Sequence, residues 1–199
     1  MGAEVPAEEV TSFPPLADVN VRVLVLGSMP GIASLQAVQY YAHPRNVFWR
    51  LMEHLFGIPS DANYSSRLEQ LLGQGIGLWD VLQHCRRVGS LDSNIRGNSE
   101  IPNDFGGFLA RHPHIHSIYF NGRKAEQVFH RKALPLILQL HPQLANRLSQ
   151  ITLTGLPSTS PAMASLDFSA KLERWQHLAV SLNPKRDSPS ANEKIAPTS

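Results

Sequence analysis

Short branched apolar runs that alternate with amphipathic segments constrain the fold of this 199-residue chain more than any other feature. The run Val21–Leu26 ends at Gly27, a pattern typical of a strand buried on both faces of a parallel sheet. The same reasoning predicts strands at 21–26, 75–81, 115–120 and 151–154, and helices at 46–56, 64–72, 105–111, 123–131 and 168–182. Strands that alternate with helices predict an α/β fold, a three-layer α/β/α sandwich with a central, mostly parallel four-stranded sheet.

All the predicted elements fall within residues 21–183, which we interpret as a single domain. Residues 1–20 and 184–199 each contain three prolines, so we expect a flexible N-terminal segment and a flexible C-terminal tail. No apolar run reaches the ~18 residues that a membrane span needs, and the first residues lack the pattern of a secretory signal. We therefore expect a cytoplasmic protein with no membrane partner.

The cysteine and charge content narrow the classes of function. Cys85 is the single cysteine, and no Cys/His cluster has the spacing of a zinc or iron–sulfur site, so we expect no metal and no cofactor. The net charge is +2, but residues 1–20 hold four acidic side chains and no basic one, which places the positive excess in the domain. This balance fits a polyanionic partner, although a solvated basic face would give the same numbers.

In a parallel sheet the ligand site lies beyond the carboxyl ends of the strands, which directs attention to four loops. These loops follow Leu26, Leu78, Phe120 and Thr154. The first is the turn 27–31 (Gly-Ser-Met-Pro-Gly), which can aim backbone N–H groups at a ligand. Its spacing is neither that of a dinucleotide-binding loop nor that of a P-loop. We take Ser28 and Met29 of this turn as site candidates.

Two adjacent tyrosines, a proline-fixed loop and an asparagine follow one another in the segment 40–49 (Tyr-Tyr-Ala-His-Pro-Arg-Asn-Val-Phe-Trp). Tyr41, with Tyr40 as the second choice, offers a stacking surface for a planar ligand. Asn46 places an amide dipole close to it, although capping of the next helix would explain this residue equally well. Arg45 is a candidate for phosphate binding because its planar guanidinium suits phosphate oxygens.

Polar residues also stand at or near the ends of the next two strands. Asp80 stands near the end of strand 75–81, where an ionised carboxylate would only accept hydrogen bonds; it could instead cap a helix. Asn121 follows strand 115–120 and is a candidate for ligand binding. The segment 84–96 contains three arginines and small polar residues, which fits either a loop that grips phosphates or an exposed turn. We select Arg96 from it.

The fourth loop, 155–165, is rich in proline, serine and threonine. Hydroxyl groups in such a loop can hydrogen-bond phosphate oxygens. The site candidates from this loop are Ser158, Thr159, Ser160, Ala162 and Met163.

Taken together, these segments resemble the uracil-DNA glycosylase superfamily. The G-S-x-P-G turn, the Y-Y-x-H-P-R-N-x-F-W segment and the L-P-S-T-S-P loop are similar to those of its hypoxanthine-DNA glycosylase branch, and the similarity runs from Val21 to about Leu182. Mismatch-specific uracil and thymine relatives carry an Asn before the first proline, where this chain has Met29, and uracil-specific relatives carry a His where it has Leu156.

The resemblance implies a monofunctional DNA glycosylase that hydrolyses the N-glycosidic bond of a deaminated base in base excision repair, with hypoxanthine as the first choice and uracil as the second. It implies catalytic roles for Asn46 and Ser28, base contacts from Tyr41, Tyr40, Met29, Asp80 and Asn121, and DNA contacts from Arg45, Arg96 and the five residues of the fourth loop. The expected partner is double-stranded DNA containing a deaminated base, with single-stranded DNA as a second form, bound by a monomer.

Two other functions remain open at the level of sequence. A glycosylase-like module that binds damaged or single-stranded DNA without cutting would account for Met29 and Leu156, which lack the polar groups of the uracil-specific enzymes. A small-molecule hydrolase on an α/β scaffold has less support, because the chain has no G-x-S-x-G elbow and no Ser/His/Asp set in its loops.

Overall fold

The computed structural model describes residues 7–183, and its centre is a four-stranded sheet in the order β3-β2-β6-β7 with every pair parallel. The strands are β2 (Val23–Gly27), β3 (Ile76–Asp80), β6 (Ser117–Asn121) and β7 (Thr152–Leu156). All four lie where the apolar runs predicted them, shifted by up to two residues. The predicted parallel sheet is therefore confirmed.

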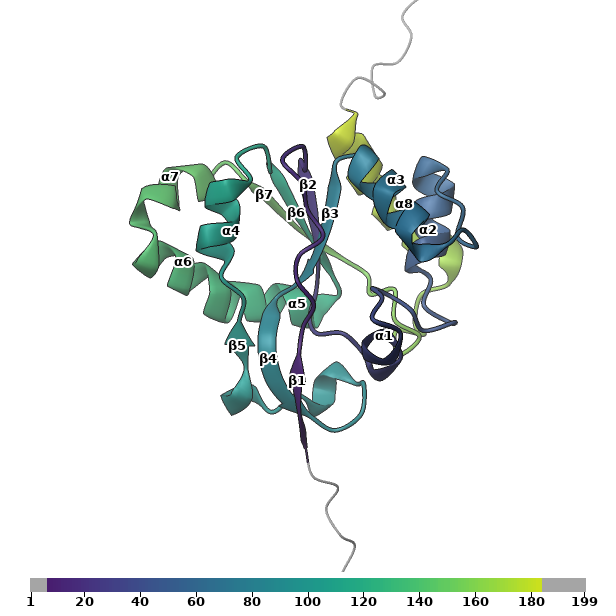
Figure 1. Ribbon diagram of the computed structural model, residues 1–199, viewed down its shortest axis with the longest axis horizontal. Helices are drawn as coiled ribbons and strands as arrows, with labels where there is room; N and C mark the ends of the chain where they lie inside the picture. Colours follow the sequence, from purple (N-terminus) through teal and green to yellow (C-terminus); the bar gives the residue numbers. More distant parts are fainter. Residues whose placement is uncertain (1–6, 184–199) are drawn as a thin grey trace, which may run out of the picture.

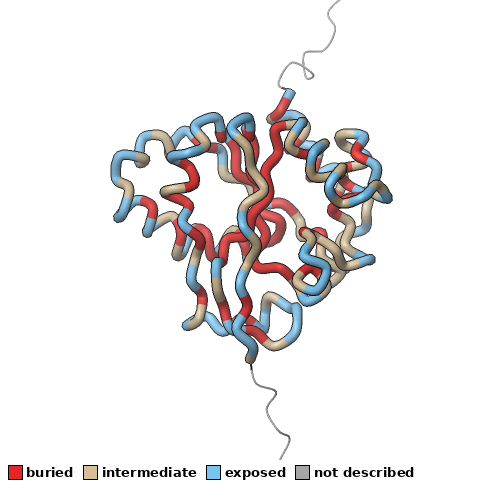
Figure 2. Tube along the Cα trace, viewed as in Figure 1, coloured by how far each residue is buried: buried red, intermediate tan, exposed pale blue. Residues whose placement is uncertain are grey.

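The sheet is buried because β2 sends alternate side chains into two separate cores. Leu24 and Leu26 belong to one cluster of buried residues, while Val23 and Val25 belong to the other. All four are fully buried, and Figure 2 shows the central strands as the most continuous buried segment of the chain. A strand covered on both faces has no polar side to alternate with, which is why its sequence is a continuous apolar run.

Helices cover both faces of the sheet and complete the predicted three-layer sandwich (Figure 1). One face carries α2 (Phe48–Phe56), α3 (Tyr64–Gly73) and α8 (Phe168–Leu182). The other carries α4 (Phe105–Arg111), α5 (Arg123–Val128), the π-helical turn η3 (Phe129–Ala133), α6 (Leu134–Leu140) and α7 (Ala145–Leu148). The predicted helix 123–131 thus spans α5 and the start of η3, and α6 and α7 extend the layer.

A second, antiparallel sheet of three strands continues below the first, in the order β1-β4-β5 (Figure 1). Its strands are β1 (Glu8–Thr11), β4 (Leu82–Arg87) and β5 (Ile101–Pro102). Strand β4 follows β3 after a single residue, so the predicted loop 84–96 begins as a strand and not as an exposed turn. The alternative role of Asp80 as a helix cap is excluded, because a strand and not a helix follows it.

The N-terminal segment packs against the domain along much of its length. Strand β1 pairs with β4, and Leu16 exchanges two backbone hydrogen bonds with Leu78 of β3. The predicted boundary at residue 21 therefore falls inside the folded part. The predicted C-terminal tail, 184–199, lies outside the described residues. Within residues 7–183, none of the helices has the length and apolar character to cross a membrane.

Parallel strands bring their carboxyl ends to one edge of the sheet, where the chain leaves β2 through the turn 27–31 into the short helix α1 (Ile32–Ala37). Three short 3-10 turns complete the structure: η1 (Asp92–Asn94) and η2 (Gly97–Ser99) between β4 and β5, and η4 (Pro142–Leu144) before α7. The four predicted loops meet at the edge of the sheet that holds the carboxyl ends of the parallel strands.

Candidate active site

A cavity of about 570 Å³ opens at the carboxyl ends of the parallel strands, and all four predicted loops contribute to it. Thirteen of the predicted site residues line it: Ser28, Met29, Tyr40, Tyr41, Arg45, Asn46, Asp80, Asn121, Ser158, Thr159, Ser160, Ala162 and Met163. Arg96 does not; it lines a separate cavity of about 300 Å³ on the antiparallel sheet. The strand-end argument therefore located the cavity, and Arg96 lies outside it.

Asp80 forms a buried end of this cavity. The carboxyl group lies directly over Gly27, where a Cβ atom would come within 2.5 Å of Asp80 Oδ1, so the pair requires glycine at 27. Asp80 Oδ2 is buried and has no hydrogen-bond partner. Burial, and then the nearby Asp92 carboxyl, raise the pKa of Asp80 to about 8, against an opposing effect of Arg87. Asp80 is therefore mostly neutral at pH 7, and differs from the ionised carboxylate that we expected.

Tyr41 stands beside Asp80 with its ring in the cavity. Its backbone takes the left-handed conformation (φ 58°), an unfavourable state for a bulky residue that is often found at functional sites. The ring stacks on Phe48 with centroids 4.0 Å apart, which fixes its plane. The hydroxyl group is buried and makes no hydrogen bond of standard geometry; burial raises the pKa of Tyr41, and the nearby amide of Asn121 opposes this rise. Tyr41 and Asp80 thus each bring one unpaired polar atom to the same end of the cavity.

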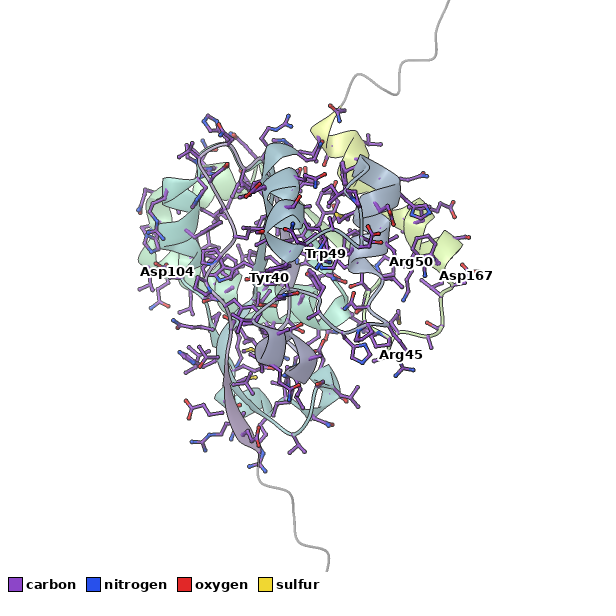
Figure 3. The ribbon with its side chains drawn as sticks, turned by 45° about the vertical axis from the view of Figure 1, so that its right-hand side comes forward. Tyr40, Arg45, Trp49, Arg50, Asp104 and Asp167 are labelled. Atoms are coloured by element: carbon purple, nitrogen blue, oxygen red, sulfur yellow. The ribbon has the colours of Figure 1, made fainter. Side chains whose placement is uncertain are left out.

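Tyr40 is engaged elsewhere. Its hydroxyl group donates to the carbonyl oxygen of Pro14 at 3.1 Å, and its ring packs edge-on against Phe13. Figure 3 shows Tyr40 well inside the molecule, while Arg45 lies at its periphery on the loop before α2. This arrangement favours Tyr41 over Tyr40 for stacking, the order that we predicted.

Asn46 lies one residue before the N-cap of α2, which is Val47. Its Oδ1 accepts a hydrogen bond from the backbone N–H of Phe48 at 3.0 Å, so the amide is held at the start of the helix. Asn46 thus binds the first turn of α2 without being its N-cap, and it lines the cavity. Its Nδ2 group makes no hydrogen bond within the described residues and stays available to a ligand or a water molecule.

Asn121 and Thr159 clamp the fourth loop to the end of β6. Asn121 Nδ2 donates to Thr159 Oγ1 at 2.9 Å, and Thr159 N–H donates to Asn121 Oδ1 at 2.8 Å. Thr159 is buried, and its carbonyl oxygen also accepts from the N–H of Val47. Both residues are therefore occupied with each other, which leaves Ser158 and Ser160 as the hydroxyl groups of this loop that can reach a phosphate.

Helix α8 holds the fourth loop through two side-chain hydrogen bonds, a role that the sequence analysis did not predict. Lys171 Nζ donates to the carbonyl oxygen of Met163 at 2.8 Å, and Trp175 Nε1 donates to that of Pro157 at 3.0 Å. Both side chains are buried. The loop is held at two points, and Met163, which is 37% exposed, projects at the rim of the cavity. Leu91, 49% exposed, lies at the same rim.

Asp92 is a cavity residue that the sequence did not single out for this purpose. Its Oδ1 accepts a hydrogen bond from Ser28 Oγ at 2.6 Å, across 64 positions of the chain. Arg87, from the segment interpreted as a phosphate-gripping loop or an exposed turn, is buried and donates to the carbonyl oxygen of Pro30. Only the three-dimensional pairing of η1 with the turn 27–31 reveals Asp92, because nothing in the local sequence marks it.

This cavity can be compared with those of known proteins. A family model described as the Uracil DNA glycosylase superfamily matches residues 14–179. The chain belongs to the uracil DNA glycosylase superfamily. The predicted resemblance and the predicted enzyme class, a DNA glycosylase, are confirmed by this membership.

Relatives of this superfamily member support the predicted branch. Two curated proteins named hypoxanthine DNA glycosylase align over 114 residues, 57% of this chain and 71% of each relative: one from Methanosarcina acetivorans at 46% identity and one from Methanosarcina barkeri at 42%. A solution NMR structure from Methanosarcina acetivorans, provisionally described as a uracil DNA glycosylase, matches with a TM-score of 0.70 and 34% identity. That match covers 88% of this chain and 99% of the other.

The glycosylase cavity contains no cluster that would hold a metal ion: among the described residues, no three His, Cys, Asp or Glu side chains come together in that way.

Proposed function

We propose that this glycosylase removes hypoxanthine from DNA in base excision repair, with uracil as a secondary substrate. The unpaired atoms of Asp80 and Tyr41 carry the proposal. A buried polar atom without a partner costs about 1–3 kcal/mol, so a ligand that pairs with it recovers that free energy. A neutral carboxyl group both donates and accepts, which matches an N–H beside a carbonyl oxygen, as on hypoxanthine and uracil.

The base reaches this end of the cavity only after it leaves the duplex. Extrusion costs a few kcal/mol and least for a poorly paired lesion such as hypoxanthine opposite thymine. Stacking on Tyr41, which is already fixed against Phe48, recovers roughly 1–3 kcal/mol of this cost. In this proposal Met29 and Asn121 shape the walls, and Asn121 acts through its clamp on the fourth loop.

The rim of the cavity is suited to double-stranded DNA. Ser158 and Ser160 offer hydroxyl groups, Arg45 is exposed beside them, and Met163 or Ala162 projects as a wedge into the gap that the base leaves. The residues that line the cavity include no lysine that could attack the sugar, which fits a monofunctional enzyme. We propose that one monomer makes these contacts, to duplex or to single strands.

A gel assay of abasic-site formation tests the proposal. Duplexes and single strands carrying hypoxanthine, uracil, xanthine or ethenocytosine are incubated with the wild-type chain, and we expect the fastest release from hypoxanthine. Asn46→Ala should lose activity by about a hundredfold or more, because it removes the amide that orients water.

Asn63→Ala is the control, because Asn63 also accepts a backbone hydrogen bond through its Oδ1 at the start of a helix, from Ser66 at the start of α3, and does not line the cavity. It removes a hydrogen bond at a helix start and should leave base release unchanged. Binding of lesion DNA with no abasic product from any substrate would overturn the proposal and favour a binding module.

A further inference from the structure

The proposed function assigns no role to Asp92, one of the acidic residues that line the cavity. Asp80 and Asp92 are the two carboxyl groups that line it, and only Asp80 is used to hold the base. Asp92 belongs to η1, in the segment between β4 and β5, and its side chain contacts the turn 27–31. There Ser28 Oγ donates to Asp92 Oδ1 at 2.6 Å, a short hydrogen bond typical of a hydroxyl group and a charged carboxylate.

The two carboxyl groups have different surroundings, and these set different charges. Asp80 is completely buried and its Oδ2 has no donor. Asp92 is partly exposed and has the Ser28 hydroxyl as a donor, which opposes the effect of burial on its pKa. Two acids whose environments differ in this way take different protonation states, and a glycosidic site can use one neutral and one ionised acid. Asp92 is the group suited to carry the negative charge.

Buried positive charge supports the ionised form of Asp92. Arg87 is 1% exposed, its Nε and Nη1 have no hydrogen-bond partner, and it makes no ion pair within residues 7–183. Burial raises the pKa of Asp92 above its usual range, and the Ser28 hydroxyl, Arg87 from β4 and Lys124 from α5 oppose this rise. Asp80 from β3 is the other acid of the cavity, and His43 and Arg45 line it as well. An unpaired buried guanidinium is costly unless it stabilises a nearby anion.

The water molecule of the reaction also needs an acceptor. Asn46 Oδ1 already accepts from the backbone of Phe48, so the free end of this amide is the Nδ2 donor. A donor can position the oxygen of a water molecule, but it cannot take a proton from it. A second group must do so, and of the two cavity carboxyl groups Asp92 is the one with a hydrogen-bond donor, Ser28 Oγ, to stabilise its charged form.

We propose, on the basis of the proposed function, that Asp92 is a catalytic residue, the carboxylate that stabilises the cationic sugar and accepts the proton of the attacking water. The C1′–N9 bond breaks first, and its electron pair leaves with hypoxanthine. The water oxygen then bonds to C1′ and gives one proton to Asp92, which passes it through solvent to the departing base. Ser28 is a positioning residue for this carboxylate, and no other reactant is consumed.

A matched pair of variants separates the charge from the hydrogen bond. Asp92→Asn removes the charge but keeps an oxygen that can accept from Ser28. Ser28→Ala removes the hydrogen bond but keeps the carboxylate. Both are measured by single-turnover base release from a hypoxanthine duplex across pH, by affinity for the same duplex, and by thermal unfolding.

We expect Asp92→Asn to slow single-turnover release about a hundredfold or more, with affinity for the duplex and unfolding temperature close to those of the wild type. The wild-type rate should fall as pH drops through the pKa of Asp92, and this acid limb should be absent in Asp92→Asn. Ser28→Ala should keep the acid limb and lose less than about tenfold in rate.

An Asp92→Asn variant that is as fast as the wild type would overturn the inference and leave the proposed function intact. The inference would also be overturned if Ser28→Ala and Asp92→Asn slowed release equally and both kept the acid limb. Asp92 would then only support the turn 27–31. A wild-type chain that releases no base from any lesion would instead overturn the proposed function itself.

Discussion

At the scale of single residues, base binding in the cavity depends on the protonated, neutral form of the Asp80 carboxyl group. Asp80 is neutral below about pH 8 and should lose its donor above it, so kcat/KM for hypoxanthine release should fall as pH rises through about 8. Asp80→Asn carries a donor and an acceptor at every pH. We expect it to lack this alkaline fall and to stay within about tenfold of the wild type at pH 7, whereas Asp80→Ala should lose about a hundredfold.

A pH profile of all three chains checks this residue. If the alkaline limb persists in Asp80→Asn, another group is responsible for it and the neutral-acid interpretation is wrong.

Asp80 also makes the free energy of unfolding depend on pH, and the raised pKa sets the direction of this dependence. The folded chain holds the Asp80 proton up to about pH 8, while the unfolded chain releases it near pH 4, so the folded state binds more protons between these values. The contribution of Asp80 to stability therefore falls as pH rises through this range, by at most about 1.4 kcal/mol per pH unit.

Asp80→Asn removes this penalty. Its free energy of unfolding in urea should exceed that of the wild type at pH 8, and the two should approach one another near pH 4. Equal stability of the two chains at both pH values would contradict the raised pKa.

At the scale of secondary-structure elements, the fourth loop is held to the sheet by a side-chain clamp and not by its own fold. Asn121→Ala removes two buried hydrogen bonds to Thr159, worth about 1–3 kcal/mol together. The loop carries the rim contacts, so we expect weaker binding of duplex DNA with a smaller effect on the rate of the bound complex. Thr159→Ser keeps both bonds and should behave as the wild type. A loss confined to the chemical step would instead place Asn121 at the reacting atoms.

Elements differed in how far their sequence predicts them. Helix 168–182 and helix 105–111 were predicted to the residue, because an Asp N-cap starts each one and an apolar stripe defines its length. Strand β4 was not, because four of its six residues are polar or charged and its partner β1 lies about 75 residues away. Arg87 belongs to the same strand and is buried, whereas its sequence left the segment open as a phosphate-gripping loop or an exposed turn.

The site divides in a similar way. The strand-end rule predicted which loops meet, and so brought Asp80 and Asn121 together, whereas Tyr41 and Asn46, between α1 and α2, were selected by residue type and by the resemblance. It could not predict which polar atoms lack a partner, since that depends on packing, nor that Asp92 returns to Ser28, since that contact joins segments 64 positions apart.

At the scale of the whole molecule, the cavity and its rim lie at the carboxyl ends of the parallel strands, while α4 lies in the helical layer on one face of the sheet (Figure 1). Arg45 lines the cavity, and Arg111, also exposed, ends α4 and does not line it. If DNA lies across the cavity face, the two arginines contribute differently to binding although they add the same charge to the chain.

Salt titration separates these contributions. Each phosphate that a cation neutralises adds about 0.9 to the slope of log affinity against log salt concentration. Arg45→Ala should therefore weaken binding of all duplexes and reduce the slope by about 0.9, whereas Arg111→Ala should leave the slope unchanged. An equal decrease for both would mean that the positive charge acts as a diffuse field, and that DNA does not follow the cavity face. Arg96→Ala, measured alongside, decides whether the DNA extends as far as the antiparallel sheet, where Arg96 lies.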